Sequence, residues 1–433
     1  MVSLQFRNGN MEKTVLPLRQ AEIFKQQALA WANKFGVCIL LDGNHHTSGF
    51  SWQLAVDAWS FVDANAGNAF AQLEQFLQAK KQTVFGFMAY ELKNEIENLT
   101  SRHTDNIGLP HLFFFEPRYL IEVNGNSVTI NRNYPEAFEI VESILQTPLP
   151  EAATNAPDWE FRTEKEKYVH TIETIKERIA AGDFYEINYC IEAHATQAAV
   201  EPVMLFHKLN TAAKAPFACF VKYYSSYVLC ASPERFLKKE GARVFSQPMK
   251  GTIAKSNIES ENRALQLQLQ QSEKERAENI MIVDLVRNDL AKSCKTGSVK
   301  VDELCGVYAF ETINQMISTI SGTAKNEVGI TDVIKNAFPM GSMTGAPKIE
   351  VMQAIDVIED FQRGIFSGTV GYITPTGDFD FNVVIRSIFY HAAKGYLSLR
   401  SGGAITYDSQ AESEWNEVLL KMKAMREVFA SGS

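Results

Sequence analysis

Residues 366–400 contain three strand-like runs: Phe366-Ser-Gly-Thr-Val-Gly-Tyr-Ile-Thr374, Phe379-Asp-Phe-Asn-Val-Val-Ile-Arg-Ser-Ile-Phe-Tyr390 and Tyr396-Leu-Ser-Leu-Arg400. Short connections that contain glycine separate them, and glycine is one of the strongest breaks between strands. Strands that follow one another in succession favour an antiparallel core over repeated βαβ units. This stretch therefore predicts part of an antiparallel sheet.

The rest of the chain alternates clusters of strands with long helices. The spacing of apolar residues predicts further strands at 36–41, 84–90, 112–115, 127–131, 185–191, 217–223, 227–231 and 313–323. It predicts helices at 16–35, 69–79, 165–181, 259–290, 349–361 and 410–429, the third of them stopped by Gly182. Several strands in succession, rather than strictly alternating strands and helices, indicate the α+β class with a large antiparallel core.

Composition and charge exclude several classes of protein. The chain has 433 residues, of which 45% are hydrophobic and 21% charged, as in ordinary globular proteins, and this excludes disordered and collagen-like chains. A net charge of −9 without a basic stripe argues against nucleic acid or an anionic membrane as partner. No apolar run is long enough to cross a bilayer, and the first ten residues lack the apolar core of a signal peptide. We therefore expect a cytoplasmic enzyme or binding protein.

Cysteine and proline positions give two further expectations. The six cysteines are scattered without a CxxC pair, which favours free buried thiols over disulfides or zinc. Residues 146–160 contain three prolines and little periodicity. This segment is the best candidate for a linker between an N-terminal part, residues 1–150, and a C-terminal part, residues 161–433. The sequence contains no GxGxxG motif or P-loop, so nothing supports nucleotide binding.

The closing helix carries a row of charged residues. Glu414, Glu417 and Lys421 are three and four residues apart, so they lie along one face beside an apolar stripe. Such a row is commonly a solvated helix surface. The alternative is that the two carboxylates belong to a site.

A second acidic pair, Glu275 and Glu278, favours the alternative. It precedes the apolar segment 279–286, which is predicted to be buried on most sides. A carboxylate at the end of a buried segment must be paired, protonated or bound to metal. Two carboxylate pairs without a nearby histidine or cysteine suit Mg²⁺ rather than zinc. The sequence does not show whether the two helices meet.

Lys250 lies in the segment 246–252, between two strand candidates. Pro248 and Gly251 predict a tight bend around it. One interpretation is an exposed turn lysine. The other is a desolvated lysine with a lowered pKa, which could act as a neutral nucleophile.

Three further features suit an anionic ligand. The segment 338–348 is rich in glycine and proline and precedes a helix, whose N–H groups could bind a carboxylate or phosphate. Glycines in 400–405 would allow a ligand to approach the backbone. Arg386 follows an apolar strand and needs an acidic partner, which a substrate carboxylate could provide. Each feature alone is also explained by an ordinary loop, bulge or ion pair.

Together these segments resemble the chorismate-utilising enzymes, and among them the aminodeoxychorismate synthase component I family. The resemblance spans residues 161–425 and is fainter before residue 160, at 86–90 and 109–113. The motifs that carry it, in order, are Ser232-Pro-Glu-Arg-Phe-Leu237, Pro248-Met-Lys-Gly-Thr252, Glu278-Asn-Ile-Met-Ile-Val-Asp-Leu-Val-Arg-Asn-Asp289, Gly341-Ser-Met-Thr-Gly-Ala-Pro-Lys348, Arg363-Gly-Ile-Phe-Ser-Gly-Thr-Val-Gly371, Ile385-Arg386, and Asp408-Ser409 followed by Glu414, Glu417 and Lys421.

The resemblance implies a fold and a set of site residues. The fold would be a large two-layer antiparallel β-sandwich with flanking helices, in which the N- and C-terminal halves are interleaved. Glu278 and Glu417 would bind Mg²⁺, supported by Glu275 and Glu414. Glu234 would be the general acid that protonates the departing C4 hydroxyl of chorismate. The residues implied to bind or line the substrate are Thr252, Thr344, Arg386, Gly402, Gly403, Ala404 and Lys421.

The resemblance also implies a reaction, for which Lys250 is decisive. Anthranilate synthases carry alanine at this position, whereas in aminodeoxychorismate synthases a lysine attacks C2 and ammonia then displaces it by adding at C4. The product would be 4-amino-4-deoxychorismate, in the 4-aminobenzoate and folate pathway. The lysine base of isochorismate and salicylate makers is absent from the segment 182–187. Anthranilate or isochorismate synthesis, and an inactive regulatory member of the family, remain the alternatives.

The chain departs from the family pattern at a few positions. Gln315 replaces a histidine, Glu186 replaces a glutamine, and Ala404 replaces a glycine. The segment 40–43 departs from the run that serves tryptophan feedback in anthranilate synthases, so this control is not implied. None of the cysteines lies in the glycine-rich elbow that a glutaminase needs. A separate glutaminase subunit, or free ammonia, is therefore the expected nitrogen source.

Overall fold

The computed structural model describes residues 4–8, 11–44, 50–151, 157–311 and 313–430. The α-helices are α1 (Ala21–Ala32), α2 (Ala69–Gln78), α3 (Lys93–Ile96), α4 (Tyr134–Leu145), α5 (Lys165–Ala181), α6 (Pro202–Ala213), α7 (Glu259–Gln271), α8 (Glu273–Ser293), α9 (Ile330–Ala337), α10 (Lys348–Ile358) and α11 (Ala411–Glu427). The strands are β1 (Leu4–Asn8), β2 (Met11–Pro17), β3 (Val37–Asp42), β4 (Trp52–Ala64), β5 (Val84–Met88), β6 (Leu112–Asn124), β7 (Ser127–Ile130), β8 (Glu160–Phe161), β9 (Glu186–Ala195), β10 (Phe217–Tyr223), β11 (Ser226–Ser232), β12 (Arg235–Glu240), β13 (Arg243–Gln247), β14 (Met249–Ala254), β15 (Lys300–Ala309), β16 (Ile313–Thr323), β17 (Gly345–Ala346), β18 (Thr369–Ile373), β19 (Phe379–Asn382), β20 (Ser387–His391) and β21 (Tyr396–Ile405).

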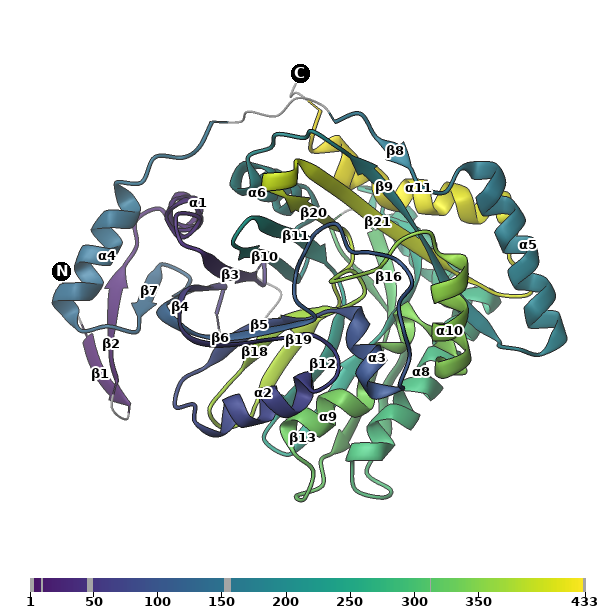
Figure 1. The fold of residues 1–433 in the computed structure, drawn as a ribbon, viewed down its shortest axis with the longest axis horizontal. Coiled ribbons are helices and arrows are strands. Elements are labelled where there is room, and N and C mark those ends of the chain that lie inside the picture. The colour runs from purple at the N-terminus through teal and green to yellow at the C-terminus, as the bar shows by residue number, and fades with distance from the viewer. Residues whose placement is uncertain (1–3, 9–10, 45–49, 152–156, 312, 431–433) are drawn as a thin grey trace.

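The strands form one continuous antiparallel sheet that folds into two layers (Figure 1). One layer follows the order β7-β6-β4-β3-β10-β11-β20-β21-β9. The other follows β4-β6-β5-β18-β19-β12-β13-β16-β15. Both layers share β4 and β6, which are 13 residues long and reach from one layer into the other. This arrangement confirms the predicted α+β class with a two-layer antiparallel core.

Pairing between distant strands interleaves the two halves of the chain. β3 pairs with β10 and β5 pairs with β18, so strands from the first 100 residues lie within sheets built mainly from the C-terminal half. Within the predicted linker, residues 152–156 lie outside the described part of the chain, and β8 begins at Glu160. No helix in the described part of the chain has the length and apolar character needed to span a membrane.

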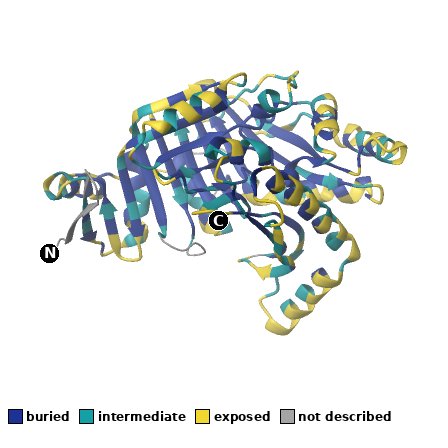
Figure 2. Cartoon of the chain, turned by 90° about the horizontal axis from the view of Figure 1, so that it is seen from below, coloured by how far each residue is buried: buried dark blue, intermediate teal, exposed yellow. Residues whose placement is uncertain are grey.

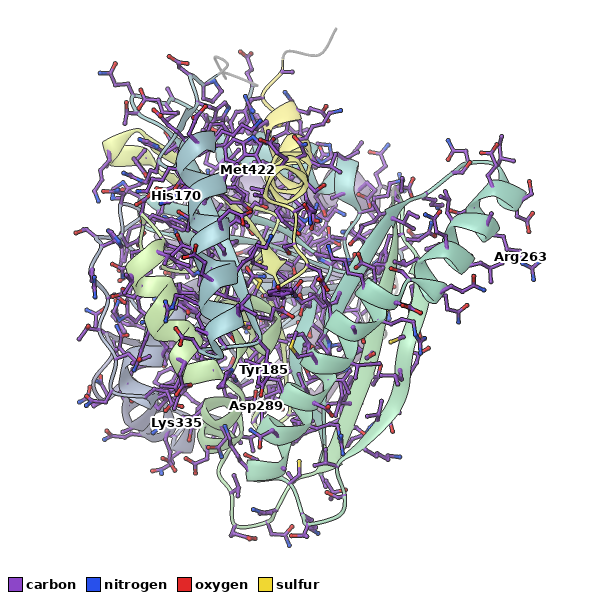
Figure 3. The ribbon with its side chains drawn as sticks, turned by 90° about the vertical axis from the view of Figure 1, so that its right-hand side faces the viewer. His170, Tyr185, Arg263, Asp289, Lys335 and Met422 are labelled. Carbon is purple, nitrogen blue, oxygen red and sulfur yellow. The ribbon has the colours of Figure 1, made fainter. Side chains whose placement is uncertain are left out.

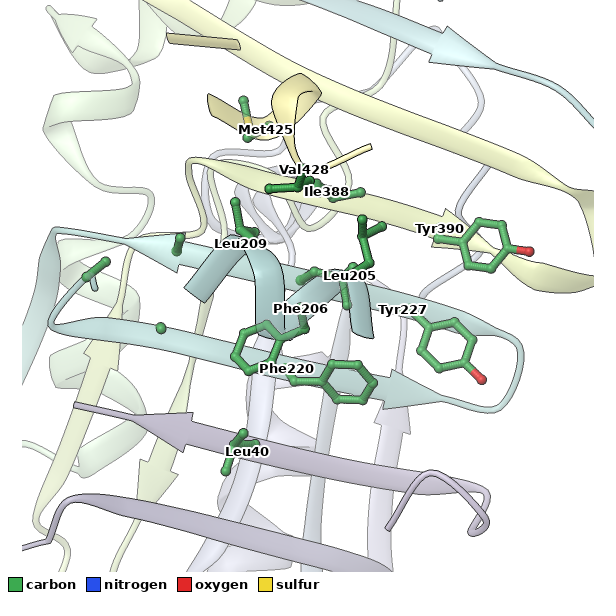
Figure 4. Packing of buried hydrophobic residues seen from close by; sticks show 14 of the residues in the cluster. Leu40, Leu205, Phe206, Leu209, Phe220, Tyr227, Ile388, Tyr390, Met425 and Val428 are labelled. Carbon is green, nitrogen blue, oxygen red and sulfur yellow. The ribbon is translucent and has the colours of Figure 1, made fainter. Parts of the chain in front are cut away.

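Alternating side chains build a core on each face of the first layer. In β10, Phe220 belongs to the cluster beneath the outer helices, whereas Cys219 and Val221 belong to the cluster between the layers. Helix α6 covers the outer face through Leu205 and Leu209 (Figure 4). Strands buried on both faces are apolar at successive positions, which is why these runs were recognisable from the sequence. Figure 2 shows the buried sheets and the exposed outer faces of the helices.

All six cysteines are buried free thiols, as predicted. The helix predicted at 16–35 is shorter, because residues up to Pro17 pair in β2 with β7 and α1 begins only at Ala21. The strand predicted at 379–390 is divided into β19 and β20. It is interrupted before Ser387, where Arg386 has a left-handed backbone with φ of +53°.

The helix predicted at 259–290 is divided at Ser272, whose backbone is extended with ψ of 112°. The Ser272 hydroxyl accepts a hydrogen bond from the backbone N–H of Glu275 at 3.4 Å and so caps α8. Because of this break, α7 and α8 have separate axes (Figure 3). In that view the label Arg263 marks α7, and Asp289 belongs to the last turns of α8. It also places Glu275 in the first turn of α8.

Candidate active site

The two acidic helices meet, which the sequence did not show. Lys274 on α8 bridges them: its Nζ lies 3.9 Å from Oε1 of Glu278 on the same helix and 3.6 Å from Oε1 of Glu414 on α11. Glu414 and Glu278 are largely buried, with 4% and 11% of their side chains exposed. The prediction that the segment after Glu278 is buried on most sides is wrong. Ile280 is 38% exposed, because α8 presents only one face to the sheet.

Strand β21 lies beneath α11 and contributes its glycines to the site. Nζ of Lys421 donates a hydrogen bond to the carbonyl of Gly402 at 2.9 Å and forms an ion pair with Glu417 at 2.7 Å. A β-carbon placed on Gly403 would lie 3.4 Å from a carboxylate oxygen of Glu414. Ala404 follows in the same strand, opposite Asn188 of β9. The predicted carboxylate-binding strand and the predicted metal-binding helix are therefore adjacent.

Burial and the crowding of like charges perturb the pKa values of the carboxylates. Burial, together with Glu186 and Glu275, raises the pKa of Glu278 to about 7, against the lowering effect of Lys250. Burial likewise raises the pKa of Glu275. Glu417 behaves differently, because Lys421 outweighs the effect of burial and holds its pKa below the usual value. The carboxylates on α8 are thus held in a state that favours a proton or another cation.

The four carboxylates have the chemistry of a Mg²⁺ site but are not arranged as a finished one. Hard oxygen ligands without histidine or cysteine suit this ion. Among the residues that the structure describes, no three acidic, histidine or cysteine side chains come together in a geometry that could hold a metal ion. The Lys274 ammonium lies between Glu278 and Glu414 instead. The four carboxylates therefore have the chemistry to bind a cation, and the Lys274 ammonium occupies the position between two of them.

Lys250 is buried, not exposed in a turn. The predicted tight bend is wrong, because β13 and β14 both continue along the same partner strand, β16, and Pro248 only interrupts the ladder. Only 9% of the Lys250 side chain is exposed. Its Nζ lies 2.9 Å from Oε1 of the fully buried Glu186. The strand order thus removes this lysine from water.

The charge state of Lys250 differs from the one that we expected. Burial lowers its pKa, but Glu186, Glu278 and Glu234 outweigh burial and raise the pKa above the usual value. The expected lowering of the Lys250 pKa is therefore wrong, because three acidic side chains surround the amine. Lys250 is an ammonium group in this environment. The second carboxylate oxygen of Glu186 is buried without a hydrogen-bond partner.

Glu234 has the properties of a carboxylic acid that is protonated near neutral pH. Burial raises its pKa to about 7, against the opposing effects of Ser342 and Lys250. The Ser342 hydroxyl donates a 2.6 Å hydrogen bond to Oε1 of Glu234. A small cavity of about 20 Å³ borders both residues and Pro248. This environment suits the predicted role of proton donor.

The loop that carries Ser342 is attached to the site from two sides. Lys348 forms a 2.6 Å ion pair with Asp289 of α8. On the other side, the backbone N–H of Asn188 donates to the carbonyl of Thr344 at 2.7 Å. The Thr344 hydroxyl is buried and donates within its own loop, to the carbonyls of Met340 and Gly341.

Gly251 allows β14 to approach α8 closely. Its φ is +86°, and a β-carbon at this position would lie 3.0 Å from a carboxylate oxygen of Glu275. The next residue, Thr252, is exposed and pairs with Gln315 of β16. The side-chain oxygen of Gln315 is buried without a hydrogen-bond partner.

Arg386 lies beyond the acidic cluster on the short segment between β19 and β20. Burial lowers its pKa, while Glu417 opposes this effect and so lies within electrostatic range.

The structure brings the predicted residues from α8, α11, β14 and β21 to one region. Lys274 and Ser342 were not predicted. The spacing of four residues between Lys274 and Glu278 could have identified the former, whereas nothing local distinguishes Ser342.

Comparison with known proteins agrees with this geometry. The family model for chorismate binding enzymes matches residues 36–427. The chain is 37% identical over 341 residues to a probable chloroplastic aminodeoxychorismate synthase of rice, covering 78% of this chain and 36% of that protein. It is 32% identical over 340 residues to aminodeoxychorismate synthase component 1 of Escherichia coli K12, covering 78% of this chain and 74% of that protein.

A solved structure shares the fold at lower identity. Anthranilate synthase component I of Streptococcus pneumoniae superposes with a TM-score of 0.77 at 22% identity, covering 86% of this chain and 91% of that one. The chain spans little more than a third of the length of the plant relative, but most of the bacterial component. On the extent of the family match and its agreement with the fold, this chain belongs to the family of chorismate binding enzymes.

Proposed function

We propose that this chain converts chorismate and ammonia to 4-amino-4-deoxychorismate, for the synthesis of 4-aminobenzoate and folate. The observation that carries the proposal is the placement of Lys250. Its ammonium group lies 2.9 Å from Glu186 of β9, and its strand, β14, packs against α8. A buried lysine beside two acidic groups with a pKa of about 7, Glu234 and Glu278, suits covalent catalysis coupled to proton transfer.

The proton balance of the first step follows from the residues present. Lys250 transfers a proton to Glu186 and attacks C2 of chorismate as the neutral amine, forming a carbon–nitrogen bond. Both ring double bonds shift by one position, which places a double bond at C4, and the C4 hydroxyl departs as water after taking a proton from Glu234. Ammonia then adds at C4, both double bonds shift back, and the bond between C2 and the Lys250 nitrogen breaks. The released amine takes its proton back from Glu186, and the new ammonium group at C4 returns a proton to Glu234. Neither substitution requires an oxidant or a reductant.

The carboxylates of the substrate would bind to the cationic side of the site. Arg386, Lys421 and the backbone of Gly402, Gly403 and Ala404 are the groups proposed for this role. Glu278 and Glu417, supported by Glu275 and Glu414, would hold Mg²⁺, which supplies a Lewis acid for the ring carboxylate. Thr252 and Thr344 would line the substrate-binding region.

Product analysis tests the proposal directly. The purified chain is incubated with chorismate, Mg²⁺ and ammonium, and a lyase that releases 4-aminobenzoate is added before separation by chromatography and mass spectrometry. We expect 4-aminobenzoate only when the lyase is present. Formation of anthranilate or isochorismate would contradict the proposal and support the corresponding alternative.

The nitrogen source is tested in the same assay. We propose that a separate glutaminase subunit supplies ammonia, because no cysteine in this chain has the context of a glutaminase nucleophile. The chain alone should therefore use ammonium salts, more effectively at higher pH, and should use glutamine only after a glutaminase is added. Glutamine-dependent turnover by the single chain would contradict this assignment.

A further inference from the structure

Lys274 holds an unusual position for a cation. It is the second residue of α8, and the N-terminal turn of a helix favours negative rather than positive side chains. Its neighbours Glu273 and Glu275 follow that rule. The helix therefore does not stabilise this ammonium group, and its stabilisation must come from the acidic residues around it.

These acidic residues come from both helices. A lysine side chain is an ammonium group at neutral pH, and that of Lys274 lies between Glu278 of α8 and Glu414 of α11. Its distances to Glu278 and Glu414, 3.9 and 3.6 Å, are those of charge attraction without a hydrogen bond. Lys274 thus neutralises the cluster electrostatically without a fixed bonding geometry.

Lys274 also differs from the other lysines of the site in its freedom to move. Its side chain is 51% exposed, whereas that of Lys250 is 9% exposed and paired with Glu186. Lys421 is held by hydrogen bonding to the carbonyl of Gly402 and by Glu417. A half-exposed lysine on a flexible stem can rotate into water at little cost.

We propose that the Lys274 ammonium is an internal counter-ion, which lies between Glu278 and Glu414 in the metal-free protein and must rotate into solvent before these carboxylates bind a divalent cation. This inference rests on the Mg²⁺ site of the proposed function. It accounts for the observation that the acidic residues converge without forming a ready-made ligand set. The lysine then limits the affinity for the cation and prevents repulsion among the carboxylates when the cation is absent.

The test uses Lys274→Met, which keeps much of the side-chain length but removes the charge. Lys423→Met is the matched control, because Lys423 is an exposed lysine on α11 that pairs with Glu427 at 3.6 Å instead of the acidic cluster. Lys274→Arg keeps the charge. Mg²⁺ affinity is measured on the substrate-free proteins by calorimetry, and thermal unfolding is recorded in EDTA and in saturating Mg²⁺.

We expect Lys274→Met to bind Mg²⁺ about fivefold more tightly than the parent, because a partly exposed ion pair that competes with the cation is lost. It should unfold at a lower temperature in EDTA and regain stability in Mg²⁺. Lys274→Arg and Lys423→Met should resemble the parent in both measurements. Unchanged or weaker Mg²⁺ binding by Lys274→Met would overturn the inference, as would an effect confined to the KM for chorismate.

Glu278→Gln separates this inference from the metal site itself. If Glu278→Gln abolishes Mg²⁺ binding and Lys274→Met leaves it unchanged, the metal site stands and the counter-ion role is wrong. If the parent and Lys274→Met both fail to bind Mg²⁺, the metal site and the counter-ion role are both wrong.

Discussion

Two charged regions of the molecule differ in how their buried charges are paired. Beneath the loop that carries Thr344, Arg363 donates two hydrogen bonds to Glu359, at 2.6 and 2.9 Å. Its remaining donors reach two backbone carbonyls and the Ser367 hydroxyl. Beside it, Arg400 pairs with Glu192 at 3.1 Å. Burial raises the pKa of Glu192, but the arginines around it outweigh burial and hold its pKa below the usual value. Both of these buried arginines therefore have a buried carboxylate as partner.

In the candidate active site, acidic side chains lie close together without one cationic partner for each. Glu234 and Glu278 each have a pKa raised to about 7, and Glu186 keeps an unpartnered oxygen. The cations nearest to them, Lys250 and Lys274, are each shared among several carboxylates. Matched pairs suit a rigid support, whereas unmatched charge suits a site that is completed by a substrate or a cation.

Replacement of Lys250 should have the largest effect. Lys250→Ala removes the proposed nucleophile, so formation of the 4-amino product should fall by about 10³-fold or more. Direct attack of ammonia at C2 becomes the remaining route, as in the anthranilate-type enzymes. Peptide mass spectrometry of the parent during turnover should find a chorismate-derived adduct on Lys250. Absence of the adduct, together with a near-parental rate in Lys250→Ala, would disprove the nucleophile role.

Breaking a matched pair should affect stability instead of chemistry. Arg363→Met leaves Glu359 buried without its partner and should lower the free energy of unfolding by about 3 kcal/mol or more. The double variant Arg363→Met/Glu359→Gln should recover a large part of this loss, since no unpaired charge remains. Denaturant unfolding of the parent, both single variants and the double variant measures the coupling. Equal stability of Arg363→Met and the parent would contradict the assignment of this pair to the support.

Removal of a proposed metal ligand should have the next largest effect. Glu278→Gln or Glu417→Gln should lower Mg²⁺-dependent turnover at least about 100-fold. Replacement of residues that only support a metal ligand already lowers metal affinity or activity by about 10- to 100-fold. EDTA should abolish the activity of the parent, and added Mg²⁺ should restore it. Full activity after exhaustive chelation would rule out the metal site.

The smallest expected effect is a pH-dependent gain in stability. The pKa of Glu234 is about 7 in the folded protein and near 4.3 in an unfolded chain. The folded state therefore binds the extra proton between these values, and the stability contributed by Glu234 is lost as pH rises towards 7. Glu234→Gln cannot ionise, so we expect its melting temperature to exceed that of the parent by about 1–2 °C at pH 8 but not at pH 4. An equal difference at both pH values would contradict the buried-acid assignment.

Local patterns predicted the regular elements well where one signal dominated. The helix expected at 165–181 is α5, and Gly182 ends it with a left-handed backbone at φ of +89°. The strands of the first layer were recognisable because burial on both faces makes them continuously apolar. The prediction failed at Ser272, since a serine within a helical pattern becomes a cap only when the chain changes direction.

The sequence by itself determined the secondary structure class, the two carboxylate pairs and the motifs that carry the family resemblance, because these depend on spacing along one element. Only the tertiary structure decided that α8 meets α11, that Lys250 is buried against Glu186, and that Lys274 lies among the carboxylates. These facts depend on which distant strands and helices pack together. Charge state follows from that packing, because burial and neighbouring charges, not residue type alone, set the pKa of each group.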